Sequence, residues 1–245
     1  MKKIYMPDVN LKKYINEELA KIIGHRESNQ DITEDEILNI TFLCADSCQI
    51  SDLTGLRYAK NLNYINLSYN NISDINELKY LTKLEKLILW HNKIEDITPL
   101  ANLKKLKHLE LDDNQITSIE PLKNLNKLTT LWLSYNNLNN IKGLENLINL
   151  NYLYLNNNNI EDINELKNLV NIEYLGLNHN KIKDVEVLQN LTNIKALGIS
   201  KNMINDLSKL SKLSLEDGFF PWDQVITVNA EYISENTYEL DFNFL

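Results

Sequence analysis

The run LEKLILWHNKIEDITPLANLKK at residues 84–105 decides the fold, because residues 106–127 repeat its spacing of apolar and polar side chains. The shared pattern is L-x-x-L-x-L-x-x-N-x-I-x-x-I-x-x-L-x-x-L-x-x, with a period of 22 residues and Leu, Ile or Val at every apolar position. Its seven copies begin at Leu62, Leu84, Leu106, Leu128, Leu150, Ile172 and Ile194. A fixed period of this kind indicates a repeat solenoid, whose copies bury their apolar side chains only by stacking on their neighbours.

The centre of each copy, such as Leu131-Trp132-Leu133, alternates between apolar and outward positions and predicts a short strand. Consecutive strands of this kind stack in parallel at about 4.8 Å. The second half of each copy predicts a return along the other side in tight turns or short 3₁₀ pieces. We therefore predict an α/β solenoid, a right-handed and curved leucine-rich-repeat horseshoe with a parallel β-sheet on its concave face and 3₁₀ turns on its convex face.

Position nine of each copy is always asparagine, and its amide can satisfy backbone groups that would otherwise be buried unpaired at a cost of about 1–3 kcal/mol. A degenerate eighth copy at residues 40–61 precedes the seven and has Cys48 in this position. We predict a structural ladder formed by Cys48, Asn70, Asn92, Asn114, Asn136, Asn158, Asn180 and Asn202.

The ends of the chain depart from the repeat. Residues 1–40 predict a helical cap, with a helix from Asp8 as N-cap to about Ile23, a stop at Gly24, and a short helix at 34–39 behind a Thr33–Glu36 capping box. The apolar stripe of the first helix is expected to be Val9, Tyr14, Ile15, Leu19 and Ile22. Residues 41–213 are the repeats, and residues 214–245 predict a β-rich segment with strands near 224–233 and 237–244.

The cap and repeats together resemble one family. The run Met6-Pro-Asp-x-Asn-Leu, the run Asp31-Ile-Thr-Glu-Asp-Glu-Ile and the repeat Asn92-Lys-Ile-Glu-Asp-Ile-Thr-Pro-Leu are similar to the helical cap and 22-residue repeats of bacterial internalins. The resemblance covers roughly residues 4–213. It implies a secreted or cell-surface protein that binds a host protein through its concave face. It also implies that residues 214–245 are either a simple cap or the first strands of an immunoglobulin-like domain.

Composition excludes several classes of function. With 34 acidic and 25 basic side chains the net charge is −9, which disfavours a polyanion such as nucleic acid as partner. No apolar run approaches the roughly 18 residues of a membrane helix. The start of the chain has no apolar stretch of a secretion signal, so it would be cytoplasmic if complete. No catalytic motif and no phosphate-binding glycine loop is present, so we expect a non-enzymatic protein without a cofactor. We also expect it to be a monomer.

The outward positions of the strands carry the candidate binding site. Aromatic and charged side chains at positions three, five, seven and eight have no core to fill, and interfaces are enriched in Trp and Tyr. The candidate partner-binding residues are Tyr64, Trp90, His108, Glu110, Asp112, Trp132, Tyr135, Tyr152, Tyr154 and Tyr174. Six of them, Trp90, Trp132, Tyr135, Tyr152, Tyr154 and Tyr174, are expected to form a contact stripe. The alternative is that the rings stack on one another and only stabilise the sheet.

The acidic residues Glu110, Asp112 and Asp113 near His91 and His108 raise the question of a metal site, but a solvated, partner-steering surface is the preferred interpretation. Three functions remain open. The first is an internalin-like module that binds a protein on its concave face. The second is an intracellular scaffold or regulatory subunit with the same fold. The third is a carbohydrate-binding protein, because Trp and Tyr platforms beside Asp and Asn also suit sugars.

Overall fold

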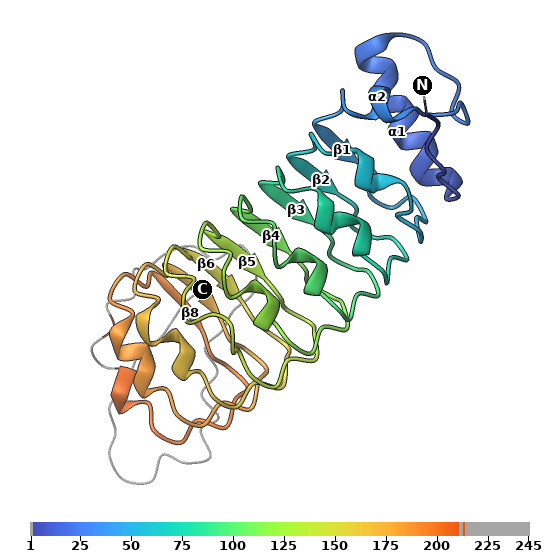
Figure 1. The fold of residues 1–245 in the computed structure, drawn as a ribbon. Helices are drawn as coiled ribbons and strands as arrows, with labels where there is room; N and C mark the ends of the chain where they lie inside the picture. Colours follow the sequence, from blue (N-terminus) through green and yellow to red (C-terminus); the bar gives the residue numbers. More distant parts are fainter. Residues whose placement is uncertain (1, 211–212, 214–245) are drawn as a thin grey trace, which may run out of the picture.

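A computed structural model describes residues 2–210 and 213, which form one elongated stack of similar coils (Figure 1). Each coil contributes one strand of three residues to a single parallel sheet whose spatial order is the chain order. The strands are β1 (Phe42–Cys44), β2 (Tyr64–Asn66), β3 (Lys86–Ile88), β4 (His108–Glu110), β5 (Thr130–Trp132), β6 (Tyr152–Tyr154), β7 (Tyr174–Gly176) and β8 (Ala196–Gly198). The fold is a curved leucine-rich-repeat solenoid, which confirms the predicted class.

The register of the sheet follows the sequence period. Leu109 pairs with Leu131 and Leu131 with Leu153, so each residue lies beside its equivalent in the next copy. Leu131 and its inward neighbour Leu133 are fully buried. Each such leucine contributes about 1.5–3 kcal/mol by leaving water. One continuous core therefore runs the length of the described stack.

Short 3₁₀ helices return the chain on the side away from the sheet. They are η1 (Leu56–Tyr58), η2 (Asn76–Tyr80), η3 (Thr98–Leu100), η4 (Glu120–Leu122), η5 (Asn164–Asn168), η6 (Glu186–Asn190) and η7 (Ser208–Leu210). The copy at residues 128–149 has a turn instead, with Gly143 at φ 109°. A Cβ at Gly143 would lie 2.8 Å from the Cα of Glu120, so only glycine fits where this turn approaches the preceding coil.

The helical cap closes the first coil. Helix α1 (Val9–Ile23) begins where the Asp8 carboxylate accepts the N–H groups of Asn10 and Leu11, both at 3.0 Å, and Gly24 follows its last residue as predicted. The other oxygen of Asp8 accepts the N–H of Ser51 at 2.9 Å, which ties the start of the helix to the first coil.

The predicted apolar stripe of α1 is wrong at both ends. Val9 is 75% exposed and Ile22 is 53% exposed, whereas Leu11, Ile15 and Leu19 are fully buried. The buried residues are spaced by four, so they share one face, and Val9 lies about 200° around the helix from Leu11.

The prediction for the second helix can be compared with the structure, whereas the prediction for the C-terminal segment cannot. Helix α2 (Glu34–Ile37) has the predicted capping box of Thr33 and Glu36 but ends at Ile37 rather than at residue 39. The strands predicted at 224–233 and 237–244 lie outside the described residues.

Candidate binding surface

The asparagines at position nine connect neighbouring coils from inside the turn. The amide of Asn136 donates to the carbonyl oxygens of Leu111 at 3.0 Å and Leu133 at 3.1 Å, and its oxygen accepts the N–H of Ile116 at 2.9 Å. Equivalent bonds to the preceding coil are made by Asn70, Asn92, Asn114, Asn158, Asn180 and Asn202. In the degenerate copy the Cys48 thiol donates to the carbonyl of Asp46 at 2.9 Å. These bonds hold the outward positions of the strands at a constant spacing.

Two further sets of side-chain bonds were missed by the sequence analysis. At position thirteen a side-chain oxygen accepts a hydrogen bond from the backbone N–H two residues later; the N–H of Thr98, for example, donates to Asp96 at 2.8 Å. At position twenty-two Asn149, Asn171 and Asn193 donate to a carbonyl of the preceding coil. Asn61 makes the equivalent bond to the carbonyl of Leu38 in the helical cap. The recurrence of Asp at position thirteen was a visible signal for the first set.

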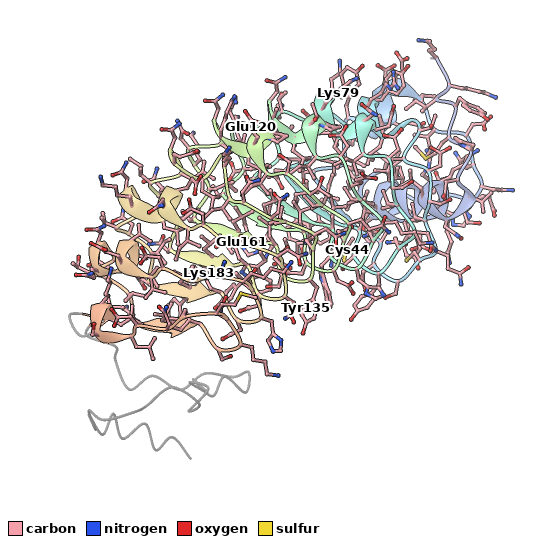
Figure 2. The ribbon with its side chains drawn as sticks, turned by 90° about the horizontal axis from the view of Figure 1, so that it is seen from below. Cys44, Lys79, Glu120, Tyr135, Glu161 and Lys183 are labelled. Atoms are coloured by element: carbon pink, nitrogen blue, oxygen red, sulfur yellow. The ribbon has the colours of Figure 1, made fainter. Side chains whose placement is uncertain are left out.

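The residue before each ladder asparagine has left-handed backbone dihedrals. The φ angles at position eight lie between 51° and 56° for Tyr69, His91, Asp113, Tyr135, Asn157, His179 and Lys201. A non-glycine residue in this region is uncommon and is strained by about 1–2 kcal/mol. Position eight forms a rim at the end of the strands, where Tyr135 is 61% exposed. Figure 2 shows Tyr135 on the opposite side of the solenoid from Lys79 of η2 and Glu120 of η4.

The candidate aromatic residues contact one another in pairs across neighbouring strands. Trp132 and Tyr154 meet edge to face with ring centroids 5.6 Å apart. Tyr152 and Tyr174 are stacked at 4.9 Å, and Tyr152 is 40% exposed. Tyr64 stacks at 4.5 Å on Phe42 of the degenerate copy, which the sequence analysis did not select. The rings therefore support the sheet and also offer their outer surfaces to solvent.

Two members of the expected stripe, Trp90 and Tyr135, are not joined to these pairs by ring contacts. Trp90 packs against Tyr69 at 4.4 Å on the side of the first copies. Tyr135 makes no ring contact with another aromatic residue that the structure describes. Strand β4 lies between the coil of Trp90 and the coil of Trp132. Its last residue is the buried Glu110, and Asp112 and Asp113 follow it in the same coil. The aromatic surface is therefore divided by an acidic centre.

The acidic centre comprises Glu110, Asp112 and Asp113. Nε2 of His108 contacts the Glu110 carboxylate, and Nδ1 of His91 contacts that of Asp113. Asp112 accepts the N–H of Ser134 at 2.8 Å. Burial raises the pKa of Asp112 to about 7, and the charge of nearby Glu110 adds to the rise while the hydrogen bonds from Ser134 oppose it.

Beside this centre the indole Nε1 of Trp132 is buried and has no hydrogen-bond partner among the residues that the structure describes. Within the same part of the chain, no group of three or more His, Cys, Asp or Glu residues has the arrangement of a metal site. None of the described helices is long and apolar enough to cross a membrane. The described strands offer an open sheet face with aromatic pairs, and carboxylates lie beside it.

The stacked coils and open sheet define a leucine-rich-repeat protein-interaction module. A family model described as "Leucine Rich repeats (2 copies)" matches residues 82–124 and 126–168. The structure of internalin C2 from Listeria monocytogenes is 32% identical, with a TM-score of 0.78, over 85% of this chain and 90% of that one. The chain belongs to the internalin family.

Two other solved structures extend the comparison. An internalin (inlF) from Listeria monocytogenes is 29% identical with a TM-score of 0.55, over 86% of this chain and 75% of that one. A leucine-rich-repeat protein from Leptospira interrogans shares the fold at 24% identity and a TM-score of 0.65, over 76% of this chain and 51% of that one. Comparison with curated protein sequences gives no match.

Proposed function

We propose that this chain is a non-catalytic, secreted or surface-exposed bacterial module that binds a host protein on its concave sheet face. The proposal depends on two aromatic contacts, Trp132–Tyr154 and Tyr152–Tyr174, at outward strand positions of an open sheet. Mutually packed rings are already ordered before a partner arrives, so binding through them costs little additional side-chain entropy. Interface hot spots are enriched in such residues.

The burial of these residues supports the same proposal. Trp132, Tyr154 and Tyr174 are half-buried. Part of each side chain is therefore exposed to solvent, and the rest is covered by neighbouring residues. Burial raises the pKa of the Tyr154 hydroxyl, so this group is a neutral hydrogen-bond donor at physiological pH. A partner placed against the sheet would meet apolar ring surface with a hydroxyl at its edge, the combination found in protein interfaces.

The test is an array of host cell-surface proteins probed with the full chain, followed by affinity measurements on each bound protein. Trp132→Ala and Tyr154→Ala should each weaken binding by about 2 kcal/mol or more. Lys79→Ala, a change on the 3₁₀ side of the solenoid (Figure 2), should leave the affinity unchanged. If circular dichroism shows that both aromatic variants are folded and their affinity is unchanged, the protein does not bind its partner through the concave face.

A glycan array run in parallel separates the protein partner from a sugar. Stacked tyrosines such as Tyr152 and Tyr174 could also carry a sugar ring on their outer surface. Binding to a defined glycan that is lost in Tyr152→Ala, without binding to any protein, would replace the proposed partner by a carbohydrate. We expect no glycan to be bound at this pair, because the two rings lie on neighbouring strands of an open sheet.

A further inference from the structure

Position twenty-two of the repeat, just before each strand, is occupied differently in two parts of the solenoid. In four places it is an asparagine whose amide donates to a backbone carbonyl of the preceding coil or of the helical cap: Asn61, Asn149, Asn171 and Asn193. In the three consecutive places between Asn61 and Asn149 it is a lysine: Lys83, Lys105 and Lys127. The centre of the described stack therefore lacks a bond that asparagine makes elsewhere at this position.

These three lysines are exposed, and none of them is paired with a carboxylate in the part of the chain that the structure describes. Nζ of Lys83 donates to the neutral amide oxygen of Asn61 at 2.6 Å. Lys105 and Lys127 make no hydrogen bond or ion pair with a described residue. The strands that follow them pair in register, so like charges stand in adjacent coils near the strand spacing of about 4.8 Å, which disfavours folding.

Two more exposed lysines extend this surface, Lys104 at position twenty-one and Lys107 at position two of the next coil. The ammonium of Lys104 donates to a backbone carbonyl at 2.7 Å, and that of Lys107 is paired with Glu85 at 2.7 Å. Lys107 lowers the pKa of Glu85, and Lys105 and Lys127 add to this effect, so the lysines lie around one carboxylate. We name this surface the basic flank: Lys83, Lys104, Lys105, Lys107 and Lys127.

The basic flank is a local reversal of the charge of the chain. The whole chain has a net charge of −9, yet positions twenty-one, twenty-two and the following position two carry five lysines and one carboxylate in these three coils. At physiological ionic strength exposed charges are screened beyond about 8 Å, so an anion that approaches this flank meets the lysines. The flank therefore favours an anionic ligand, whereas folding alone would favour asparagine.

The residues among the lysines indicate which class of anion fits. At the same positions they are Thr82, Asn126 and Thr129, whose hydroxyls and amides hydrogen-bond to neutral polar groups. No residue at these positions is aromatic. Protein interfaces are enriched in aromatic residues and depleted in lysine, and single strands of nucleic acid are bound by stacking on aromatic rings. A sugar polymer with anionic groups offers hydroxyls to the polar side chains and repeated charges to the lysines.

We propose that the basic flank binds a sulfated polysaccharide whose chain runs along the stack of coils. Sulfate groups along the polymer would contact Lys83, Lys105 and Lys127 in turn, and the release of counterions from the polymer would favour binding. None of the residues proposed to bind a protein on the concave face belongs to this flank. The flank is therefore a second binding site, and either proposal can fail without the other.

The test is the anisotropy of a fluorescent heparin oligosaccharide titrated with the full chain at physiological ionic strength. The flank variant receives the asparagine that other coils have at position twenty-two: Lys83→Asn, Lys105→Asn and Lys127→Asn. The matched control loses the same charge at positions ten and twelve, where Asn71 and Asn139 occur in other coils: Lys93→Asn, Lys181→Asn and Lys183→Asn. We expect the flank variant to lose at least about tenfold in affinity and the control about twofold or less.

The same flank variant should melt at the temperature of the unaltered chain or higher. It gains side-chain hydrogen bonds between coils and loses the repulsion between neighbouring lysines. A lower melting temperature would show that the fold itself requires the lysines, and it would overturn the proposal.

Equal losses of affinity in the two triple variants would also overturn it, because they would show a general attraction of heparin to any lysine of the chain. Absence of heparin binding by the unaltered chain has the same consequence, and so does equally tight binding of desulfated heparin. Single-stranded DNA that binds as tightly as heparin, with the same dependence on the flank lysines, would assign the flank to nucleic acid instead.

Discussion

The side-chain amide of Asn136 donates a hydrogen bond to the carbonyl oxygen of Leu111 in the preceding coil, at 3.0 Å. A second hydrogen bond, from the N–H of Ile116 to the Asn136 oxygen at 2.9 Å, returns from the same coil. The residue therefore joins two coils from inside a buried turn. Its removal leaves the N–H of Ile116 without this acceptor, whereas the carbonyl of Leu111 keeps its hydrogen bond from the Asn114 amide at 3.1 Å.

Asn136→Ala should lower the free energy of unfolding by about 1–3 kcal/mol, because the N–H of Ile116 is left buried without an acceptor. Urea denaturation followed by circular dichroism measures the change. Asn137→Ala is the matched control, since this exposed neighbour contributes only its backbone N–H, which donates to the carbonyl of Ile116. Equal stability of the two variants would contradict the ladder.

Gly143→Ala should lower the melting temperature more than Gly24→Ala does. Both residues have positive φ, 109° and 95°, so alanine is strained at each by about 1–3 kcal/mol. At Gly143 the new Cβ would also lie 2.8 Å from the carbonyl oxygen of Ile119, whereas at Gly24 nothing lies within 4 Å. Thermal melts should show the larger decrease for Gly143→Ala, and a smaller decrease than for Gly24→Ala would refute the close approach of the coils.

Asp112 should make the protein less stable as pH rises. Its pKa is raised from an ordinary 3.8 to about 7 in the folded state, so the folded state binds the proton more tightly. The resulting stabilisation is fully present below the ordinary pKa and is lost as pH rises through about 7. Asp112→Asn should therefore raise the melting temperature relative to the unaltered chain more at pH 8 than at pH 5.

Asp96 provides the control of opposite sign. Hydrogen bonds from Thr98 lower the pKa of this carboxyl, so its contribution is present at neutral pH and lost as pH falls through the lowered value. Asp96→Asn should therefore not gain stability at pH 8. A gain for both variants would show that the pH effect reflects the net charge of the chain and not the burial of Asp112.

The sequence period determines most of the fold, because inward leucines such as Leu131 and ladder residues such as Asn136 recur at constant spacing. It does not determine how outward side chains meet. Trp132 packs edge to face on Tyr154 whereas Tyr152 stacks flat on Tyr174, and this difference depends on side-chain rotamers. The expected stripe therefore says which strand positions carry aromatic residues but not which of their rings touch, and its role in binding stays a prediction. Helix spacing likewise could not show which of Val9 and Leu11 the first coil covers.

Trp132→Phe should leave the protein as stable as before or slightly more stable. The change keeps an aromatic ring against Tyr154 and removes an indole N–H that is buried without an acceptor among the described residues. Replacing an unpaired buried donor by apolar atoms is nearly neutral or stabilising. The melting temperature measures this, with Trp132→Ala as the comparison that also loses the ring. A large loss of stability in Trp132→Phe would mean that the N–H has a partner.

Tyr135→Asn separates the role of the rim in folding from its role in binding. Tyr135 has φ 56° and is 61% exposed, and the equivalent position one coil later is naturally Asn157 at φ 54°. Asparagine tolerates left-handed dihedrals better than tyrosine, so the variant should gain up to about 1 kcal/mol in stability. If Tyr135 contacts the host protein, the same variant should bind more weakly although it is more stable. Urea unfolding and affinity measurements on one preparation test the expected gain in stability and the expected loss of affinity. A loss of stability would show that the exposed ring supports the fold.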